Sequence, residues 1–179
     1  MSRLADQVKQ AVEAFAECKT QPALIGGLAL AAHDVVRATR DVDFLVDADD
    51  AQTVDDALLA LGYECIHRSK DAANYARGNQ RLDMLYAYRS VARRLLNHAS
   101  YRDTVMGRLR VISAEGLIGF KLQALVNAPQ RASDRADILA LLRTGRGKLD
   151  MQEVRSYFAL FDRTELLDEL LREIDHGAA

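Results

Sequence analysis

Residues 23–46 read ALIGGLALAAHDVVRATRDVDFLV. A short apolar run ends in the pair Gly26-Gly27, and thirteen residues separate this pair from Asp41. Asp41 and Asp43 alternate with apolar residues, so we expect a strand that presents both carboxylates on one face. Glycines after a strand let backbone N–H groups approach phosphate oxygens closely. The stretch therefore predicts a divalent metal site beside a phosphate-binding turn.

The composition limits the class of protein. The chain has 179 residues, 49% of them hydrophobic, which suits one domain with a substantial core. No run approaches the roughly 18 apolar residues of a transmembrane helix, and the first residues carry charges where a signal peptide is apolar. The sequence therefore predicts a cytoplasmic protein with no membrane partner. Cys18 and Cys65 lack metal-ligand spacing and are expected to be free thiols.

Charge is distributed unevenly along the chain. Residues 68–148 hold 16 Lys and Arg against 6 Asp and Glu, whereas both flanking segments are acidic and the net charge is −2. A basic middle section would attract a polyanion such as a triphosphate or a nucleic acid. The segments could equally neutralise one another in the folded chain, so both interpretations stay open.

Apolar periodicity, glycines and prolines predict a mixed α/β fold. Helices are expected over 4–18, 28–35, 51–61, 88–98, 114–126, 132–143, 150–160 and 163–175. Strands are expected over 23–25, 41–46, 63–68, 74–77, 81–87, 104–106 and 108–112, with a hairpin turn at 77–80. The fold class is α/β (α+β), a mixed sheet flanked by helices. Residues 1–112 would form the core, and residues 113–179 a helical section packed on it as one compact domain.

A third carboxylate lies in another apolar strand. Asp83 alternates with Leu82 and Met84, so its side chain leaves the face opposite theirs. If this strand pairs beside the strand of Asp41 and Asp43, three carboxylates gather. Such a cluster suits two-metal nucleotidyl transfer, in which one metal activates a hydroxyl and the other holds the triphosphate. Taken alone, an acidic pair is more often a solvated strand end.

Together, these motifs resemble the nucleotidyltransferase superfamily related to DNA polymerase β, in which Gly-Gly or Gly-Ser precedes Asp-x-Asp. More narrowly, RATRDVD at 37–43 resembles the Arg-x-Thr-x-Asp-x-Asp of AbiEii-like nucleotidyltransferases, a group that includes toxins of toxin–antitoxin systems. SAEGLIGFKL at 113–122 resembles that group's second motif, a helix ending in Lys, and RASDRADI at 131–138 resembles its third. The resemblance covers residues 22–143.

The resemblance implies roles for the acidic and glycine residues. Asp41, Asp43 and Asp83 would bind the metal ions, with Asp83 acting as ligand or base. Gly26 and Gly27 would hold the triphosphate.

It also implies roles for residues beyond the acidic strands. Lys121 would reach a phosphate or the developing negative charge, and Asp134 or Asp137 would position Lys121 or the acceptor. Arg37 and Thr39 would contact the nucleotide or the acceptor. Structural alternatives exist for four of these residues. Lys121 could be a solvated helix edge, and Asp134 could be favoured in a first turn by the helix dipole. Arg37 and Thr39 could pack within a loop.

A group of tyrosines and arginines could stack on and neutralise a single-stranded RNA end, or could be strand aromatics beside a basic helix face. It comprises Tyr86, Tyr88, Tyr101, Arg89, Arg93, Arg94 and Arg102.

We therefore expect an Mg²⁺- or Mn²⁺-dependent enzyme that transfers a nucleoside monophosphate from an NTP to a hydroxyl. The basic middle section favours an RNA acceptor such as a tRNA, while a protein acceptor and a toxin–antitoxin role with an antitoxin partner stay open. Two alternatives remain. One is an inactive nucleotidyltransferase-fold module that binds nucleotide, RNA or a protein, and the other is an interaction protein whose aspartates are surface charges.

Overall fold

The computed structural model describes residues 3–177, which divide into two compact units. The first contains the chain up to Ala32 together with Arg37–Ser113, and the second contains His33–Val36 and the chain from Ala114 onward. Each unit has its own set of fully buried apolar side chains.

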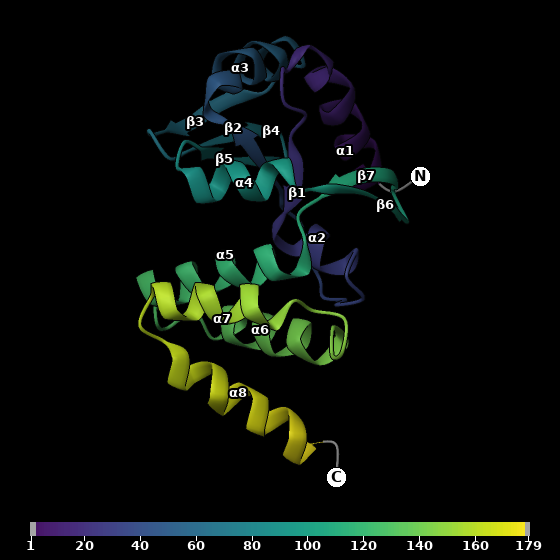
Figure 1. Ribbon diagram of the computed structural model, residues 1–179. Coiled ribbons are helices and arrows are strands. Elements are labelled where there is room, and N and C mark those ends of the chain that lie inside the picture. Colours follow the sequence, from purple (N-terminus) through teal and green to yellow (C-terminus); the bar gives the residue numbers. More distant parts are fainter. Residues whose placement is uncertain (1–2, 178–179) are drawn as a thin grey trace. The chain divides into compact units, whose positions relative to one another are not determined.

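A seven-stranded mixed sheet forms the centre of the first unit (Figure 1). Its strands are β1 (Ala23–Ile25), β2 (Val42–Asp47), β3 (Glu64–Arg68), β4 (Ala72–Arg77), β5 (Gln80–Ala87), β6 (Ser100–Thr104) and β7 (Gly107–Val111). They lie in the order β3-β4-β5-β2-β1-β7-β6. β2 runs parallel to β5, β1 runs antiparallel to β2, and β1 pairs in parallel with β7. The predicted mixed α/β fold with a flanked sheet is confirmed.

Helices α1 and α3 cover one face of this sheet (Figure 1). The helices of the first unit are α1 (Arg3–Ala14), α2 (Gly26–Ala31), α3 (Ala51–Ala60) and α4 (Ser90–Asn97), with 3₁₀ turns η1 (Phe15–Glu17) and η2 (Ala48–Asp50). The Phe15 ring meets the Phe44 ring edge-on, with centroids 5.3 Å apart. Burying each such apolar side chain stabilises the fold by about 1.5–3 kcal/mol. Because side chains alternate along a strand, Phe44 facing the helices places Asp43 on the opposite face of the sheet.

The β6–β7 hairpin turns two residues earlier than the sequence predicts. The expected strand at 104–106 is wrong, because β6 ends at Thr104 and the turn follows. The Thr104 hydroxyl accepts a hydrogen bond from the Met106 amide at 3.1 Å and donates one to the Gly107 carbonyl at 2.7 Å. Gly107 has φ 108°, which favours glycine. These turn hydrogen bonds outweigh the strand propensity of Val105 at the tip of the hairpin.

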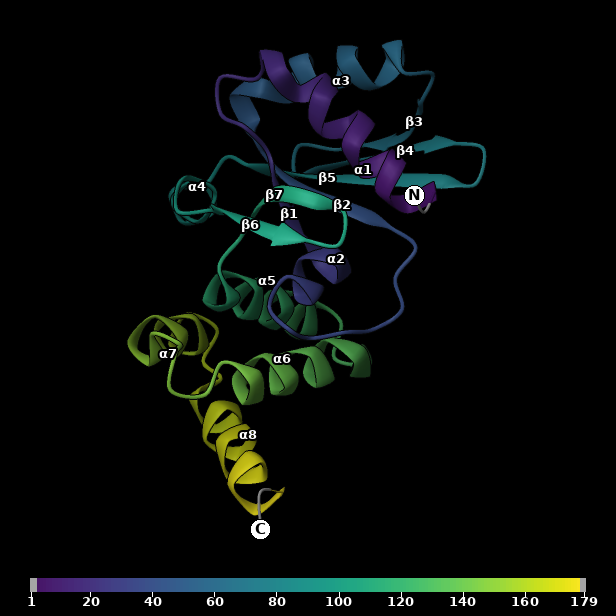
Figure 2. The ribbon, with the colours of Figure 1, turned by 90° about the vertical axis from the view of Figure 1, so that its right-hand side faces the viewer.

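The second unit is helical (Figure 2). It contains α5 (Ala114–Asn127), α6 (Ala132–Thr144), α7 (Met151–Leu160) and α8 (Thr164–Gly177). Leu122, Ile138 and Phe158 are completely buried in its core. Asp150 caps α7, since its carboxylate accepts from the backbone N–H groups of the second and third residues that follow. No helix in residues 3–177 has the length and apolar character needed to cross a membrane.

Candidate active site

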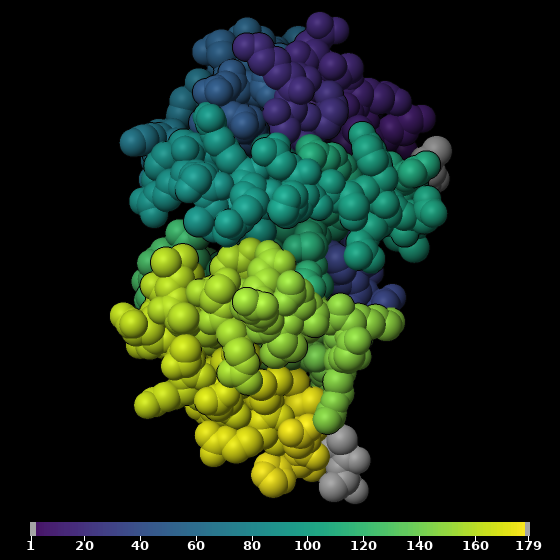
Figure 3. Space-filling view, viewed as in Figure 1, coloured from purple at the N-terminus to yellow at the C-terminus, as the bar shows by residue number. Residues whose placement is uncertain are grey.

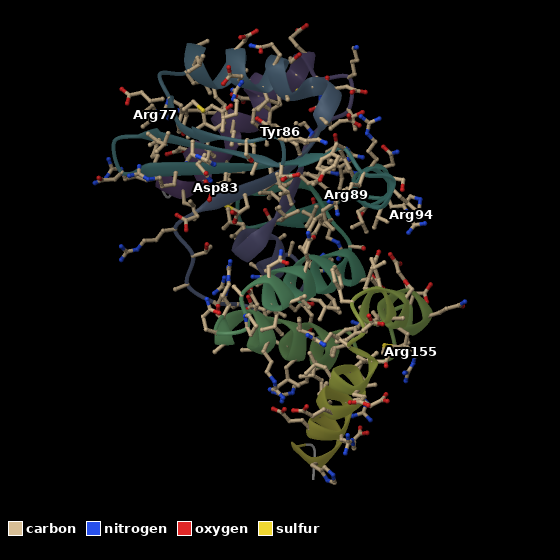
Figure 4. The ribbon with its side chains drawn as sticks, turned by 90° about the vertical axis from the view of Figure 1, so that its left-hand side faces the viewer. Arg77, Asp83, Tyr86, Arg89, Arg94 and Arg155 are labelled. Carbon is tan, nitrogen blue, oxygen red and sulfur yellow. The ribbon has the colours of Figure 1, made fainter. Side chains whose placement is uncertain are left out.

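Asp43 and Asp83 lie side by side on the face of the sheet opposite α1 and α3. β2 and β5 pair in parallel with Asp43 opposite Asp83, so their Cα atoms are about one strand spacing, ~5 Å, apart. Both residues are half-buried, while Phe44 and Met84 point into the core. The expected pairing of the two acidic strands is confirmed, and it brings two of the three predicted carboxylates together. Figure 4 labels Asp83 in this sheet.

The glycine pair packs against the acidic segment. Gly26 has φ +66°, and a Cβ added there would lie 2.7 Å from Cγ of Asp43. A Cβ on Gly27 would lie 2.7 Å from Oγ1 of Thr39. Both positions therefore require glycine, because a side chain would displace Asp43 or Thr39. The sequence predicted phosphate contact here, and it missed this close packing.

Thr39 and Asp41 precede β2 in a loop. The Thr39 hydroxyl donates to the Asp41 carbonyl at 3.3 Å, so Thr39 links Gly27 to the start of the acidic strand. Asp41 and Arg37 are exposed. Among the described residues, no group of three or more His, Cys, Asp or Glu lies close enough to hold a metal ion. Asp41 is thus not gathered with the Asp43–Asp83 pair in this structure.

Asn74 is a further polar residue of this face that the sequence analysis overlooked. Its amide donates to Oδ1 of Asp83 at 2.7 Å. The signal was present, because the predicted turn at 77–80 joins antiparallel strands. Pairing Arg77 with Gln80 places Asn74 directly opposite Asp83, as the structure shows.

The second unit contains a buried cluster of charges between α5 and α6. Nζ of Lys121 lies 2.9 Å from Oδ1 of Asp134 and 2.8 Å from Oδ2 of Asp137. Nε of Arg131 lies 2.7 Å from the other oxygen of Asp134, which is 0% exposed. Lys121 occurs within α5 rather than at its end, since that helix continues to Asn127. The expected association of Lys121 with both aspartates is present, and their predicted catalytic roles stay predictions.

Another buried carboxylate lies on the helix-covered side of the sheet. Asp55 of α3 accepts a hydrogen bond from the Tyr75 hydroxyl at 2.8 Å and forms an ion pair with Arg68. Burial, reinforced by the Asp55 carboxylate, raises the pKa of Tyr75. Burial likewise raises the pKa of Tyr86, whose ring lies in this core. Tyr86 therefore cannot stack on RNA, and that part of the predicted tyrosine and arginine group is wrong.

Four exposed arginines and one exposed tyrosine mark α4, its N-cap and the β6–β7 hairpin. We call them the basic surface: Arg89, Arg94, Arg102, Arg108 and Tyr101. Tyr101 is 57% exposed, and the Arg108 guanidinium lies 5.6 Å from its ring centroid. Within residues 3–177 these arginines form no ion pair, whereas Arg93 pairs with Asp47 and Asp49.

The basic surface belongs to the first unit, where alternation along β6 places Arg102 on the face opposite Tyr101. Its elements form a continuous teal band in the space-filling view (Figure 3). Arg89 and Arg94 extend outward from this region (Figure 4). Exposed arginines that form no ion pair, beside an exposed aromatic ring, are complementary to a flexible polyanion.

Comparison with known proteins gives one matching protein family and several solved structures with a similar fold. A family described as uncharacterised nucleotidyltransferase matches residues 2–116, more than half of the chain. No curated protein matches the sequence.

Solved nucleotidyltransferase structures share the fold. ANT(2″)-Ia, in complex with adenylyl-2″-tobramycin, gives a TM-score of 0.69 at 16% identity, covering 90% of this chain and 98% of its own. Lincomycin-bound LnuA, a lincosamide antibiotic adenylyltransferase, gives 0.56 at 17% identity, covering 76% and 94%. An antigenic nucleotidyltransferase-like protein from Paracoccidioides brasiliensis gives 0.54 at 19% identity, covering 96% and 93%. At these identities the likeness concerns the fold.

Proposed function

Because the chain belongs to the family described as uncharacterised nucleotidyltransferase, we propose that it transfers a nucleoside monophosphate from an NTP to a hydroxyl group. The observation that carries this proposal is the pairing of Asp43 with Asp83 on one face of the sheet, with Gly26 packed against Asp43. The narrower resemblance to AbiEii-like toxins stays a prediction.

The donor set fits a hard divalent cation. Carboxylate oxygens are the ligands that Mg²⁺ and Mn²⁺ prefer, and Asp43 and Asp83 present two carboxylates from adjacent strands. Asp41, which lies in the loop directly before β2, would supply the third. When bound, the metal would neutralise triphosphate charge and make the acceptor hydroxyl more acidic.

The chain's own side chains and backbone would accept the proton and bind the phosphates. The acceptor oxygen bonds to the α-phosphorus, the bond to pyrophosphate breaks, and the hydroxyl proton passes to a carboxylate, for which Asp83 is the candidate. The backbone of Gly26 and Gly27, bare of side chains, would lie against the phosphates. Arg37 is exposed and would bind phosphate or acceptor, and Lys121 stays a predicted phosphate ligand.

The basic surface favours RNA as the acceptor. Its exposed arginines would bind phosphates, and Tyr101 would stack on a base. A protein acceptor, or an antitoxin that covers the site, would bind the same chain without producing labelled RNA. An inactive module would bind nucleotide or RNA without transfer.

Metal and nucleotide binding can be tested by thermal denaturation. Mg²⁺ or Mn²⁺ with an NTP is expected to raise the unfolding midpoint of the wild type. The double variant Asp41→Ala with Asp43→Ala is expected to show no shift. A wild type that shows no shift would contradict the proposal.

Transfer can be tested with α-labelled NTPs and total RNA, with an aminoglycoside as a parallel acceptor. We expect labelled RNA with the wild type and none with Asp43→Ala. Arg94→Glu with Arg102→Glu should reduce RNA labelling but keep the nucleotide-induced midpoint shift, whereas Arg155→Glu in α7 serves as the matched control. Label on the aminoglycoside alone would overturn the RNA assignment, and binding without label would favour the inactive module.

A further inference from the structure

We infer that Asn74 is a positioning residue that orients Asp83 for metal binding. The inference rests on the proposed function, since it assigns a task to a residue beside the proposed metal ligands. Asn74 lies on β4, in antiparallel register with Asp83 of β5.

The contact between the two side chains is short and directional. Nδ2 of Asn74 donates to Oδ1 of Asp83 at 2.7 Å, within the range of a charge-assisted hydrogen bond. An ionised carboxylate only accepts hydrogen bonds, so the amide nitrogen must face it. The bond limits rotation of the Asp83 carboxylate and leaves its second oxygen for another ligand.

Register extends this pair into a row across four strands. Asn74 on β4 faces Asp83 on β5, Asp83 faces Asp43 on β2, and Asp43 faces Ile25 at the end of β1. Gly26 follows directly and packs against the Asp43 side chain. The two carboxylates are therefore held from opposite ends, by an amide on one side and a bare backbone on the other.

Within β4, Asn74 is the residue of its face whose side chain can donate a hydrogen bond. The strand reads AANYAR, and the residues that share a face with Asn74 are Ala72 and Ala76. Neither alanine has a side-chain donor, so within β4 no other residue of that face can replace the amide. Tyr75 points to the opposite face and bonds to Asp55.

Removing the amide should weaken metal binding with little effect on folding. Partners that orient metal ligands typically contribute about 10–100-fold to metal affinity. We therefore expect Asn74→Ala to bind Mn²⁺ about tenfold more weakly than the wild type. Asn74→Ser, whose hydroxyl can donate through a water, should be intermediate.

The test is calorimetric titration of the full chain with Mn²⁺ alone, without NTP. The variants are Asn74→Ala, Asn74→Ser, Asp83→Ala and, as a matched control, Asn79→Ala, which removes an exposed amide from the adjoining β4–β5 turn. Metal-free unfolding midpoints are recorded for each. Asn79→Ala should bind as the wild type does, and Asp83→Ala should bind weakest.

The outcomes separate this inference from the proposed function. Weaker binding in Asn74→Ala, with an unchanged metal-free midpoint and partial recovery in Asn74→Ser, supports it. Wild-type affinity in Asn74→Ala, with affinity lost in Asp83→Ala, overturns the positioning role and leaves the proposed function standing. A wild type that binds no Mn²⁺ overturns both. If Asn74→Ala fails to fold, Asn74→Ser decides, and wild-type affinity there overturns the inference.

Discussion

Aspartates occur in two contrasting environments in this chain. Asp134 and Asp137 of α6 are buried against the ammonium group of Lys121. Asp83 of the first unit is half-buried and bonds to the neutral amide of Asn74; among the described residues it forms no ion pair. A buried carboxylate whose counter-ion is a side chain is committed to the fold, because removing the partner leaves an uncompensated charge. A carboxylate oriented by a neutral donor keeps its negative charge for a cation from solution.

The largest expected effect is on the buried charge cluster. Replacing Lys121 by Met leaves two buried aspartates without their shared cation, and breaking such a pair typically costs about 3–5 kcal/mol. We expect Lys121→Met to lower the free energy of unfolding by this amount in urea denaturation. Lys148→Met, at an exposed lysine of the same unit, is the control and should change stability little.

The comparison would fail if Lys121→Met were as stable as the wild type. Lys121 would then be an ordinary helix-edge lysine, and its closeness to Asp134 and Asp137 would carry little energy. Partial restoration of stability by Asp134→Asn in the Lys121→Met background would sharpen the comparison, since it would locate part of the cost in the excess negative charge.

A smaller effect is expected at the glycine that packs on the acidic pair. Gly26→Ala places a side chain where φ is +66° and where Asp43 already lies, and backbone strain of this kind costs about 1–3 kcal/mol. Because Asp43 must shift, we also expect the midpoint shift induced by Mg²⁺ and NTP to disappear. Gly78→Ala is the control, since Gly78 has φ +56° with nothing within 4 Å of an added Cβ. A Gly26→Ala protein that keeps the full midpoint shift would contradict the close packing.

Asp55 shows that buried, paired carboxylates are not confined to the second unit. It belongs to the first unit but is paired with Arg68 and bonded to Tyr75. Tyr75→Phe keeps the ion pair but removes two hydrogen bonds, one donated to Asp55 and one accepted from Arg68. We expect each to contribute about 0.5–1.5 kcal/mol to stability. Metal binding should be unchanged, since Tyr75 faces away from Asp83. Weakened Mn²⁺ binding in Tyr75→Phe would show that the two faces of the sheet are coupled.

The same tyrosine predicts a dependence on alkaline pH. Burial raises the pKa of Tyr75 above its ordinary value of 10.0, so the folded chain keeps a proton that the unfolded chain loses. The stabilisation is complete below pH 10.0 and is lost as pH rises beyond it. Tyr75→Phe should therefore show a shallower fall in stability above that pH, measured by urea denaturation at several pH values. An equally steep fall would assign the alkaline transition to other groups.

Most of the sheet could be predicted from the sequence, because its strands alternate or are continuously apolar. The first strand, 23–25, is β1 as predicted, and the alternation around Asp43 and Asp83 correctly predicted which face each carboxylate occupies. Asn74 was equally accessible, since the predicted turn at 77–80 determines its partner. Its pairing with Asp83 was not predicted, because the register of the two strands was not worked out from that turn.

Other features of the site depend on tertiary packing that no local pattern records. The approach of Gly26 to Asp43 joins residues from two elements, and a glycine pair alone is equally typical of an ordinary turn. The direction of Tyr86 into the core follows from alternation with Met84, but its position next to arginines in the sequence suggested a surface role. The exposed position of Asp41 reflects a loop rather than the strand expected for it.

The central claim is that Asp43 and Asp83 together bind a divalent metal ion. The most direct test is an Mn²⁺ titration, followed by electron paramagnetic resonance, of the wild type and of Asp43→Asn with Asp83→Asn. This double substitution removes two charges with almost no change in side-chain shape. We expect saturable binding by the wild type and none by the double variant, with both proteins unfolding cooperatively in the absence of metal. Equal Mn²⁺ binding by the two proteins would contradict the claim.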